Sequence, residues 1–200
     1  FAAEMRAQIK MDSAIEAPEA TGPVYRDTIY MSVVDKDRNA VSFINTLFAP
    51  FGSGQVAPES GIVLQNRGQG FVIDPGHPNC IEPNKRPLHT IIPGMLCKGG
   101  KPVMPFGVMG GQYQANGHAR VLTNMLDYGM APQDALDTPR SFAELGHLKV
   151  ERSYDPKEVQ KLADIGHKIE QDIEPIGGAQ AIMMHENGVL EGASDPRKDG

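Results

Sequence analysis

Two hydroxyl side chains, on Thr28 and Thr46, are placed where they could do chemistry. Residues 27–46 contain two runs rich in Val, Ile, Phe and Thr around a charged turn, which is the pattern of a β-hairpin. If Asp35 faces Asn39, Thr28 falls opposite Thr46, and directly opposed side chains on one sheet face lie about 5 Å apart. The pattern therefore predicts a nucleophile and a helper hydroxyl at the open end of a hairpin.

A pair of glycines, Gly110 and Gly111, is the second candidate. The pair stands between an apolar run ending at Val108 and a helix expected to begin near Gln114. Glycines there let backbone N–H groups approach a ligand, and the unpaired N–H groups at a helix start favour an oxyanion. Taken alone, a Gly-Gly pair is more often an ordinary turn.

Short motifs in a fixed order from Thr28 to the C-terminus resemble the small subunit of the γ-glutamyltranspeptidases. No single motif is specific, but together the motifs are strong evidence for this resemblance. Besides the glycine pair, they are Ser32-Val33-Val34-Asp35-Lys36-Asp37, Phe51-Gly52-Ser53-Gly54, Glu59-Ser60-Gly61-Ile62, Pro83-Asn84-Lys85-Arg86-Pro87-Leu88, Leu126-Asp127-Tyr128-Gly129, Ala135-Leu136-Asp137-Thr138-Pro139-Arg140 and Ala193-Ser194-Asp195-Pro196-Arg197.

The resemblance implies that Thr28 is a nucleophile. Members of that family are N-terminal-nucleophile hydrolases, in which a precursor cuts itself before a Thr, and the cut here would lie between Asp27 and Thr28. A Thr hydroxyl is a poor nucleophile, but a free α-amine on the same residue, with an ordinary pKa of about 7.7 to 8.0, is a base within its reach. The family uses the glycine pair as its oxyanion hole, so that role carries over to Gly110 and Gly111.

The resemblance also implies an α+β fold, as part of the four-layer α/β/β/α sandwich of N-terminal-nucleophile hydrolases. Residues 1–27 would be the end of a large-subunit region with the linker before the cut, and residues 28–200 the small-subunit catalytic region. The expected partners are a small-molecule amide substrate, water or an amino-acid or peptide acceptor, and the large-subunit region of the same precursor. A homo-oligomer is left open.

The chain departs from the family in the substrate pocket. The family holds the glutamyl α-amine with an Asn and an acidic residue at the positions of Phe48 and Gly70, and a Ser pair that helps bind the α-carboxylate is replaced by His89 and Thr90. Because a buried ammonium without acceptors is costly, we expect poor binding of γ-glutamyl groups. Arg67, near the altered position, is a candidate contact for an anionic tail such as that of a glutaryl group.

Three functions therefore stay open. The first is γ-glutamyl transfer or hydrolysis, and the second is hydrolysis of another side-chain amide, as in the related cephalosporin acylases. The third is an inactive binding or structural homologue, which the presence of Thr28, Thr46 and the two glycines disfavours.

Composition excludes several other classes. The net charge of −6 argues against nucleic-acid binding, and no run approaches the roughly 18 apolar residues of a membrane span. Cys80 and Cys97 lack Cys-x-x-Cys spacing and are expected to be buried free thiols. The six histidines contain no His-x-x-x-His pair. We therefore expect no metal and no cofactor. The segment is expected to be soluble, and its compartment, cytoplasmic or periplasmic and secreted, is left open.

Apolar periodicity and turn residues predict the remaining elements. We expect a helical N-terminus over residues 1–9, a linker over 12–23, a strand over 62–65 and a long irregular loop over 66–85 that forms part of the substrate pocket. Further elements are strands at 90–96 and 103–108, with edges or bulges at Pro93 and Pro105, a helix with an apolar stripe at Val121, Leu122, Met125 and Leu126, helices at 132–136 and 156–165, and a hairpin over 180–192.

Overall fold

The computed structural model describes residues 2–14, 27–172 and 174–198, and the chain divides into two compact units. Unit 1 comprises residues 1–21 and 138–176, and unit 2 comprises residues 22–137 and 177–200. All the predicted site residues belong to unit 2. Most of the predicted linker at 12–23 lies outside the described residues, and the division at residue 27 stays a prediction about cleavage.

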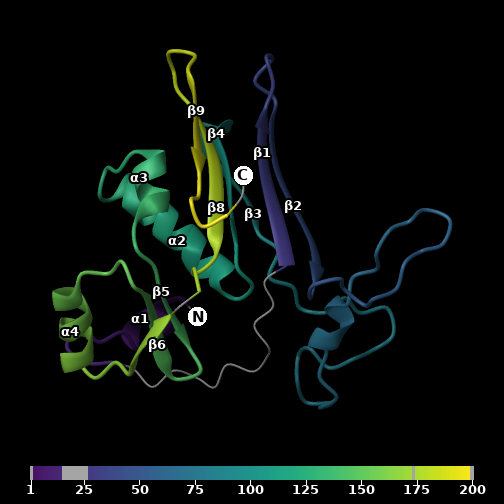
Figure 1. Ribbon diagram of the computed structural model, residues 1–200, viewed down its shortest axis with the longest axis horizontal. Helices are drawn as coiled ribbons and strands as arrows, with labels where there is room; N and C mark the ends of the chain where they lie inside the picture. The colour runs from purple at the N-terminus through teal and green to yellow at the C-terminus, as the bar shows by residue number, and fades with distance from the viewer. Residues whose placement is uncertain (1, 15–26, 173, 199–200) are drawn as a thin grey trace. The chain divides into compact units, whose positions relative to one another are not determined.

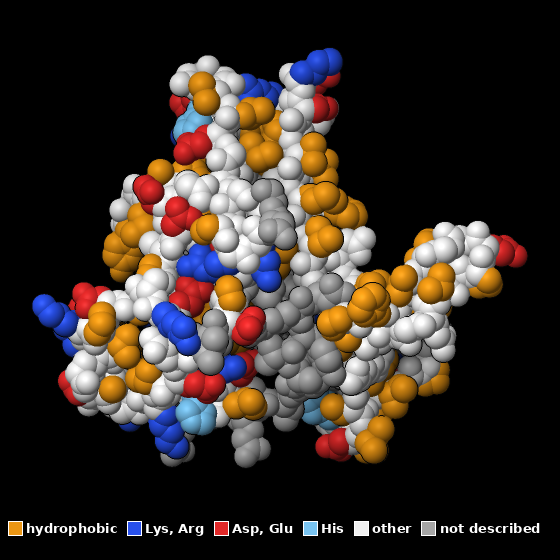
Figure 2. All heavy atoms as spheres, viewed as in Figure 1, with side chains coloured by type: hydrophobic (Ala, Val, Ile, Leu, Met, Phe, Trp, Pro, Cys, Tyr) orange, Lys and Arg blue, Asp and Glu red, His pale blue; other side chains and the backbone are white. Residues whose placement is uncertain are grey.

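The hairpin that carries the two threonines is present. Strands β1 (Asp27–Val34) and β2 (Ala40–Phe48) are antiparallel, and Thr28 pairs with Thr46 as predicted. Tyr30 on the inner face is buried, whereas apolar side chains of the other face are exposed. Hydrophobic side chains gather over this outward face (Figure 2), and its exposed members are Ile29, Met31, Val33, Val41 and Phe43.

A four-stranded sheet packs against the inner face of the hairpin (Figure 1). Its strands are β3 (Pro93–Lys98), β4 (Lys101–Met109), β8 (Gly178–Met184) and β9 (Leu190–Ser194), in the order β3-β4-β8-β9. The Tyr30 hydroxyl lies 2.8 Å from Ser42 Oγ and accepts from Ser32 Oγ at 2.9 Å, and Ser32 Oγ lies 3.1 Å from the Pro105 carbonyl. Burial raises the pKa of Tyr30, so the phenol stays protonated within this network.

Helices α2 (Tyr113–Leu126) and α3 (Pro132–Asp137) contact the same sheet on the side away from the hairpin (Figure 1). Unit 2 thus contains an α/β/β stack, three successive layers of the expected sandwich. The predicted apolar stripe of α2 is wrong in part, because Leu126 is 62% exposed and only Val121 of the four is buried. The buried face instead carries Tyr113, Gln114, Gly117, His118, Val121 and Asn124.

Prolines and short apolar runs were less predictable. β3 is an edge strand, which suits Pro93. β4 is a central strand, and its register with β3 shifts where Leu96 pairs with Met104 and Cys97 with Pro102. The irregularity therefore lies before Pro105, and the expectation of an edge or bulge at Pro105 is wrong. Pairing of β4 with β8 begins one residue later, at Phe106, so Pro105, which has no N–H, does not need to donate a hydrogen bond to β8. Cys80 is buried as expected, whereas Cys97 is exposed.

The segment from residue 62 to residue 85 is mostly irregular. The strand predicted at 62–65 is wrong, since only Val63 makes an isolated bridge, with Val56. The loop predicted at 66–85 is confirmed and contains the 3-10 turn η1 (Arg67–Gly70) and a bridge between Val72 and Cys80.

Unit 1 is built from α1 (Ala2–Ala7), β5 (Ser141–Glu144), β6 (His147–Glu151), α4 (Pro156–Asp164) and β7 (Ile169–Asp172). Its three strands, which the sequence did not predict, have the order β5-β6-β7, with β6 and β7 parallel. The Asp155 carboxylate accepts from the Lys157 N–H at 2.8 Å and caps α4. Within the described ranges, no helix is long and apolar enough to span a membrane.

Gly107 in β4 is expected to be required for close packing of the β1–β2 hairpin on the four-stranded sheet. A Cβ atom at this position would lie 2.3 Å from Cδ2 and Cε2 of Tyr30. We expect Gly107→Ala to lower the free energy of unfolding by about 1 to 3 kcal/mol, measured by urea denaturation, because β1 must move away from the sheet. Gly192→Ala in β9 is the matched control, since its Cβ would meet no atom within 4 Å. Equal effects of the two substitutions would contradict this account.

Candidate active site

The hydroxyls of Thr28 and Thr46 meet at the open end of the β1–β2 hairpin. Thr28 Oγ1 donates to Thr46 Oγ1 at 3.2 Å, and Thr46 Oγ1 accepts from the Phe48 N–H at 2.9 Å. Both threonines are half-buried. Thr46 can therefore fix the direction of the Thr28 hydroxyl, which is the helper role that the pairing predicts.

The predicted cleavage peptide lies at an irregularity of the hairpin. The register shifts between Asp27, which pairs with Phe48, and Thr28, which pairs with Thr46. Phe48 has a φ of 78°, a left-handed conformation that is unfavourable for an aromatic residue. In the intact chain the Thr28 nitrogen is part of the peptide bond, so it can act as a base only after cleavage.

The glycine pair ends β4 and precedes α2. Gly110 and Gly111 have φ values of 129° and 58°, and a Cβ on Gly110 would lie 2.8 Å from Gly177 Cα, so both conformation and space require glycine at 110. Their carbonyls accept from the N–H groups of Tyr113 and Gln114 at 3.1 and 3.2 Å. Neither N–H of the pair donates to any residue in the described part of the chain, which leaves two donors at the helix start.

A cavity lies along β1 and reaches Met109 at the end of β4. Thr28 and Met109, the residue before the glycine pair, both line this cavity of about 780 Å³, which also runs along β8 and β9. Ser32 Oγ contacts the Pro105 carbonyl and the Tyr30 ring lies against Gly107, so Thr28, two residues before Tyr30, lies toward the end of β4 that the glycine pair follows. This arrangement has the components of acyl transfer, namely a hydroxyl, an orienting partner and backbone donors.

Arg67 stacks on the ring of Phe48, two residues after Thr46. Its guanidinium carbon is 4.3 Å from the centre of the Phe48 ring, and its Nη1 donates to Thr90 Oγ1 at a long 3.5 Å. Asn66 tethers the loop, since its Oδ1 accepts from the Ala49 N–H just beyond β2 at 3.0 Å. Arg67 is only 7% exposed, and burial lowers the pKa of its guanidinium.

The other predicted substrate-binding residues divide between inside and outside this cluster. The Gly70 carbonyl accepts from Asn79 Nδ2 at 2.6 Å, and a Cβ on Gly70 would meet only the Leu88 carbonyl, at 3.8 Å, so a side chain has room there. His89 is exposed, and its Nδ1 accepts from the Ile91 N–H at 3.3 Å. The structure therefore brings Phe48, Arg67 and Thr90 together and leaves His89 outside.

Gln114 is a buried polar residue next to Thr90 that the sequence analysis did not single out. It is 1% exposed in the first turn of α2, and its Nε2 donates to Thr90 Oγ1 at 3.4 Å. His118, one turn further, packs edge-on against Phe106 with ring centres 5.0 Å apart, and burial lowers its pKa, which favours the neutral ring. The sequence signal that could have revealed Gln114 is its position two helical turns before Val121, which places both residues on the helix face that packs against β4.

Layers and site together define an N-terminal-nucleophile hydrolase fold, and comparison with known proteins identifies the family. The Gamma-glutamyltranspeptidase family model matches residues 1–200. A "Glutathione hydrolase-like YwrD proenzyme" of Bacillus subtilis is 46% identical over 192 residues, covering 92% of this chain and 37% of that protein. An "Oxamate amidohydrolase proenzyme" of Klebsiella pneumoniae is 38% identical over 201 residues, covering 95% of this chain and 38% of that protein.

Among solved structures, cephalosporin acylase from Bacillus halodurans superposes with a TM-score of 0.89 at 42% identity, covering 100% of this chain and 37% of that chain. This chain belongs to the γ-glutamyltranspeptidase family. It spans less than two-fifths of the length of these relatives, because it covers 37% or 38% of each.

Proposed function

We propose that this chain is the catalytic part of a self-processing amide hydrolase whose nucleophile is Thr28. The observation that carries the proposal is the 3.2 Å hydrogen bond between the Thr28 and Thr46 hydroxyls, next to a register shift at the peptide that would be cut. Membership of a family whose relatives are named proenzymes supports it further.

The first step is self-cleavage. Thr28 Oγ1 attacks the Asp27 carbonyl carbon, the hydroxyl proton passes to the Thr28 nitrogen, and the Asp27–Thr28 C–N bond breaks as an ester forms on Oγ1. Water then hydrolyses the ester, which returns the Thr28 hydroxyl and leaves its nitrogen as a free amine. The new amine provides the base that the intact chain lacks.

The second step is acyl transfer. The Thr28 amine takes the hydroxyl proton as Oγ1 attacks a substrate amide, and the same proton goes to the leaving amine. The N–H groups of Gly110 and Gly111 would stabilise the oxyanion, a contribution for which loss of one donor costs about 2.7 to 4 kcal/mol. Water, or an amino-acid or peptide acceptor, then releases the acyl group.

Two substrate classes are candidates. One is the γ-glutamyl amide, after relatives named glutathione hydrolases, and the other is a different side-chain amide, after those named acylase or oxamate amidohydrolase. Phe48 and Gly70 favour the second class, because they provide no carboxylate or amide acceptor for an α-amine. We propose that hydrolysis of an amide with a carboxylate-bearing acyl group is the main activity.

The proposed partner within the precursor is the region upstream of the cut. Support comes from the outward face of the hairpin, where Ile29 is 62% exposed and Val33 is 51% exposed. Contiguous apolar surface of this kind marks an interaction site.

Intact-mass measurement on the purified full-length precursor tests the proposed self-cleavage. It should yield two fragments, the second starting at Thr28, without added protease, and a persistently single chain would contradict it.

Thr46 is expected to orient the nucleophile in both steps. Thr46→Val keeps the shape and removes the hydroxyl, so we expect slower self-cleavage and a kcat lower by about 2- to 13-fold, equivalent to a neutral hydrogen bond of about 0.5 to 1.5 kcal/mol. Thr46→Ser, which keeps the hydroxyl, should restore most of both rates. Unchanged rates in Thr46→Val would mean that Thr46 contributes only to strand packing and does not orient Thr28.

A further inference from the structure

We propose that Asp195 is a positioning residue for the oxyanion donors. Its buried carboxylate fixes the start of β8, and β8 in turn fixes the glycine turn, defined here as Gly110 and Gly111. The inference rests on the proposed function, in which the N–H groups of this turn stabilise the oxyanion. The sequence motif at residues 193–197 contains Asp195 but indicates no role for it.

The start of β8 lies against the glycine turn. Met109, the last residue of β4, pairs with Gly178, the first residue of β8. A Cβ on Gly110 would lie 2.8 Å from Gly177 Cα, and a Cβ on Gly177 would lie 2.5 Å from the Met109 carbonyl oxygen. Because these backbones touch with no side chain between them, a shift of residues 177–179 is transmitted to the glycine turn.

The Asp195 carboxylate holds this start of β8. Asp195 is 1% exposed, and its Oδ2 accepts from the Ala179 N–H at 2.8 Å, while the Asp195 N–H donates to the Ala179 carbonyl at 3.1 Å. Ala179 is buried and pairs with Val108 of β4, two residues before the glycine turn. A hydrogen bond to an ionised carboxylate is stronger than one between neutral groups. Asp195 therefore fixes both backbone groups of Ala179.

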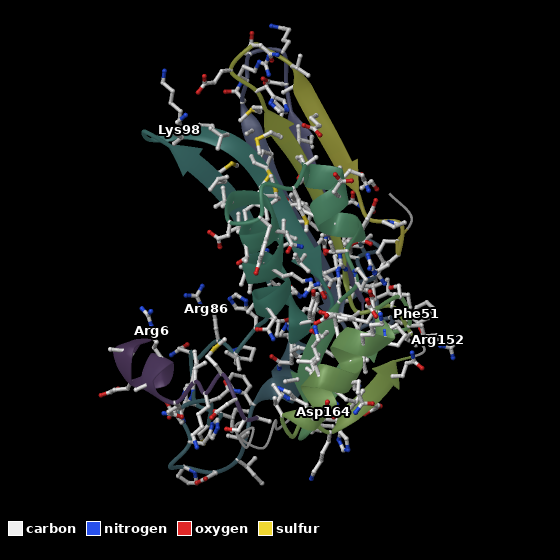
Figure 3. All side chains as sticks on the ribbon, turned by 90° about the vertical axis from the view of Figure 1, so that its left-hand side faces the viewer. Arg6, Phe51, Arg86, Lys98, Arg152 and Asp164 are labelled. Carbon is white, nitrogen blue, oxygen red and sulfur yellow. The ribbon has the colours of Figure 1, made fainter. Side chains whose placement is uncertain are left out.

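Asp195 is itself held by helix α3. Gln133 Nε2 donates to the Ser194 carbonyl at 2.9 Å, and Gln133 Oε1 accepts from the Ser194 N–H at 3.0 Å. Asp195 Oδ1 accepts from the Arg197 N–H at 3.0 Å and from Arg197 Nη1 at 3.2 Å, and the same Nη1 donates to the Leu136 carbonyl at 3.0 Å. Figure 3 looks onto the sheet from the helix side, with α2 and α3 in front of it. The contacts thus run from α3 through Asp195 and β8 to the glycine turn.

Asp195→Asn is expected to lower kcat and to leave KM nearly unchanged. An amide has one acceptor oxygen where the carboxylate has two, so its NH₂ group would face the Ala179 N–H or Arg197. Oxyanion donors act only when they are held in place before the reaction, and a misplacement of about 1 Å can cost on the order of a hundredfold in rate. We therefore expect kcat to fall about 10- to 100-fold for the faster of the glutaryl and γ-glutamyl p-nitroanilides.

A substrate with sulphur in place of the carbonyl oxygen provides a readout that a loss of stability does not move. Sulphur is the weaker hydrogen-bond acceptor, so aligned oxyanion donors favour the oxygen substrate, and misaligned donors favour it less. We expect the ratio of kcat/KM for the p-nitroanilide to that for its thioanilide to fall by on the order of tenfold in Asp195→Asn. The amount of folded enzyme cancels from this ratio, because both substrates are measured on one sample.

Glu144→Gln is the matched control. Glu144 is also a buried carboxylate, 6% exposed, and it pairs with Lys149 Nζ at 2.8 Å, in unit 1. Its substitution should lower stability and leave the oxygen-to-sulphur ratio unchanged. Gln133→Ala is the milder second variant, since it releases Ser194 and keeps the carboxylate. It should lower kcat and the ratio in the same direction as Asp195→Asn, by smaller factors.

Hydrogen exchange measures the same contacts in the precursor, whether it is cut or not. A peptide covering residues 108–112 should exchange faster in Asp195→Asn than in Glu144→Gln or the unsubstituted protein. Exchange at the unsubstituted rate in this peptide would overturn the inference.

The outcomes separate this inference from the proposed function. An unchanged oxygen-to-sulphur ratio in processed Asp195→Asn, or in Gln133→Ala where Asp195→Asn does not fold, would overturn the inference and leave the Thr28 mechanism standing. An equal fall of the ratio in Glu144→Gln would also overturn it. Failure of the unsubstituted precursor to cut at Thr28 would overturn the proposed function instead, and exchange in the uncut protein would still decide whether Asp195 fixes the glycine turn.

Discussion

Thr28→Ala in the full-length precursor is expected to leave the chain uncut and to lower the rate of amide hydrolysis by a factor on the order of 10⁶, the loss seen when a serine hydrolase loses its nucleophile. The substitution removes the only atom that our mechanism uses to attack both the Asp27 carbonyl and the substrate. The measurements are intact mass of the purified precursor and hydrolysis of glutaryl p-nitroanilide.

Thr28→Ser is the control for this prediction. It keeps a hydroxyl and, after cleavage, a free α-amine, so it should still be cut and should still turn over, at reduced rates. Cleavage of the Thr28→Ala precursor at the same peptide, with no added protease, would show that another group performs the reaction.

A change of substrate preference is the second large effect that we expect. Phe48→Asn together with Gly70→Asp should raise the ratio of kcat/KM for γ-glutamyl over glutaryl p-nitroanilide by on the order of a hundred- to ten-thousandfold. The reason is that two hydrogen-bond acceptors for the α-amine would be provided, each worth about 1.5 to 3 kcal/mol.

The backbone accommodates both changes. Phe48 has a φ of 78°, where Asn is better tolerated than Phe, and a Cβ at Gly70 would approach only the Leu88 carbonyl, at 3.8 Å. Phe48→Asn with Gly70→Asn is the control that lacks the carboxylate and should shift the ratio less. A clear preference of the unsubstituted enzyme for the γ-glutamyl substrate would mean that the amine is recognised by other residues.

The hairpin and its register were predictable because local pattern determines them. Apolar residues alternate on both sides of a short charged turn, so the pairing of Thr28 with Thr46 follows from matching Asp35 with Asn39. The hairpin at β8 and β9 was predicted in the same way. By contrast, β5 and β7 have four residues each and depend on pairing with β6, which short sequence windows do not reveal.

The polar interior of the site was less predictable, since it depends on contacts between distant segments. A Cβ on Gly117 would lie 2.5 Å from Val108 Cγ1, and this close packing of α2 on β4 turns Gln114 and His118 inward while Leu126 faces out. Likewise, buried Arg67 stacks on Phe48, which lies 19 positions earlier in the sequence. Periodicity counts apolar residues and therefore overlooks such faces.

Trapping the acyl-enzyme tests the central claim most directly. Processed enzyme would be mixed with glutaryl p-nitroanilide, quenched in acid during the first turnover and analysed by peptide mass spectrometry. Our account predicts a fragment whose amino-terminal residue is Thr28 and which carries one glutaryl group as an ester on that residue. A glutaryl group on any other residue, or a second-fragment N-terminus other than Thr28, would contradict it.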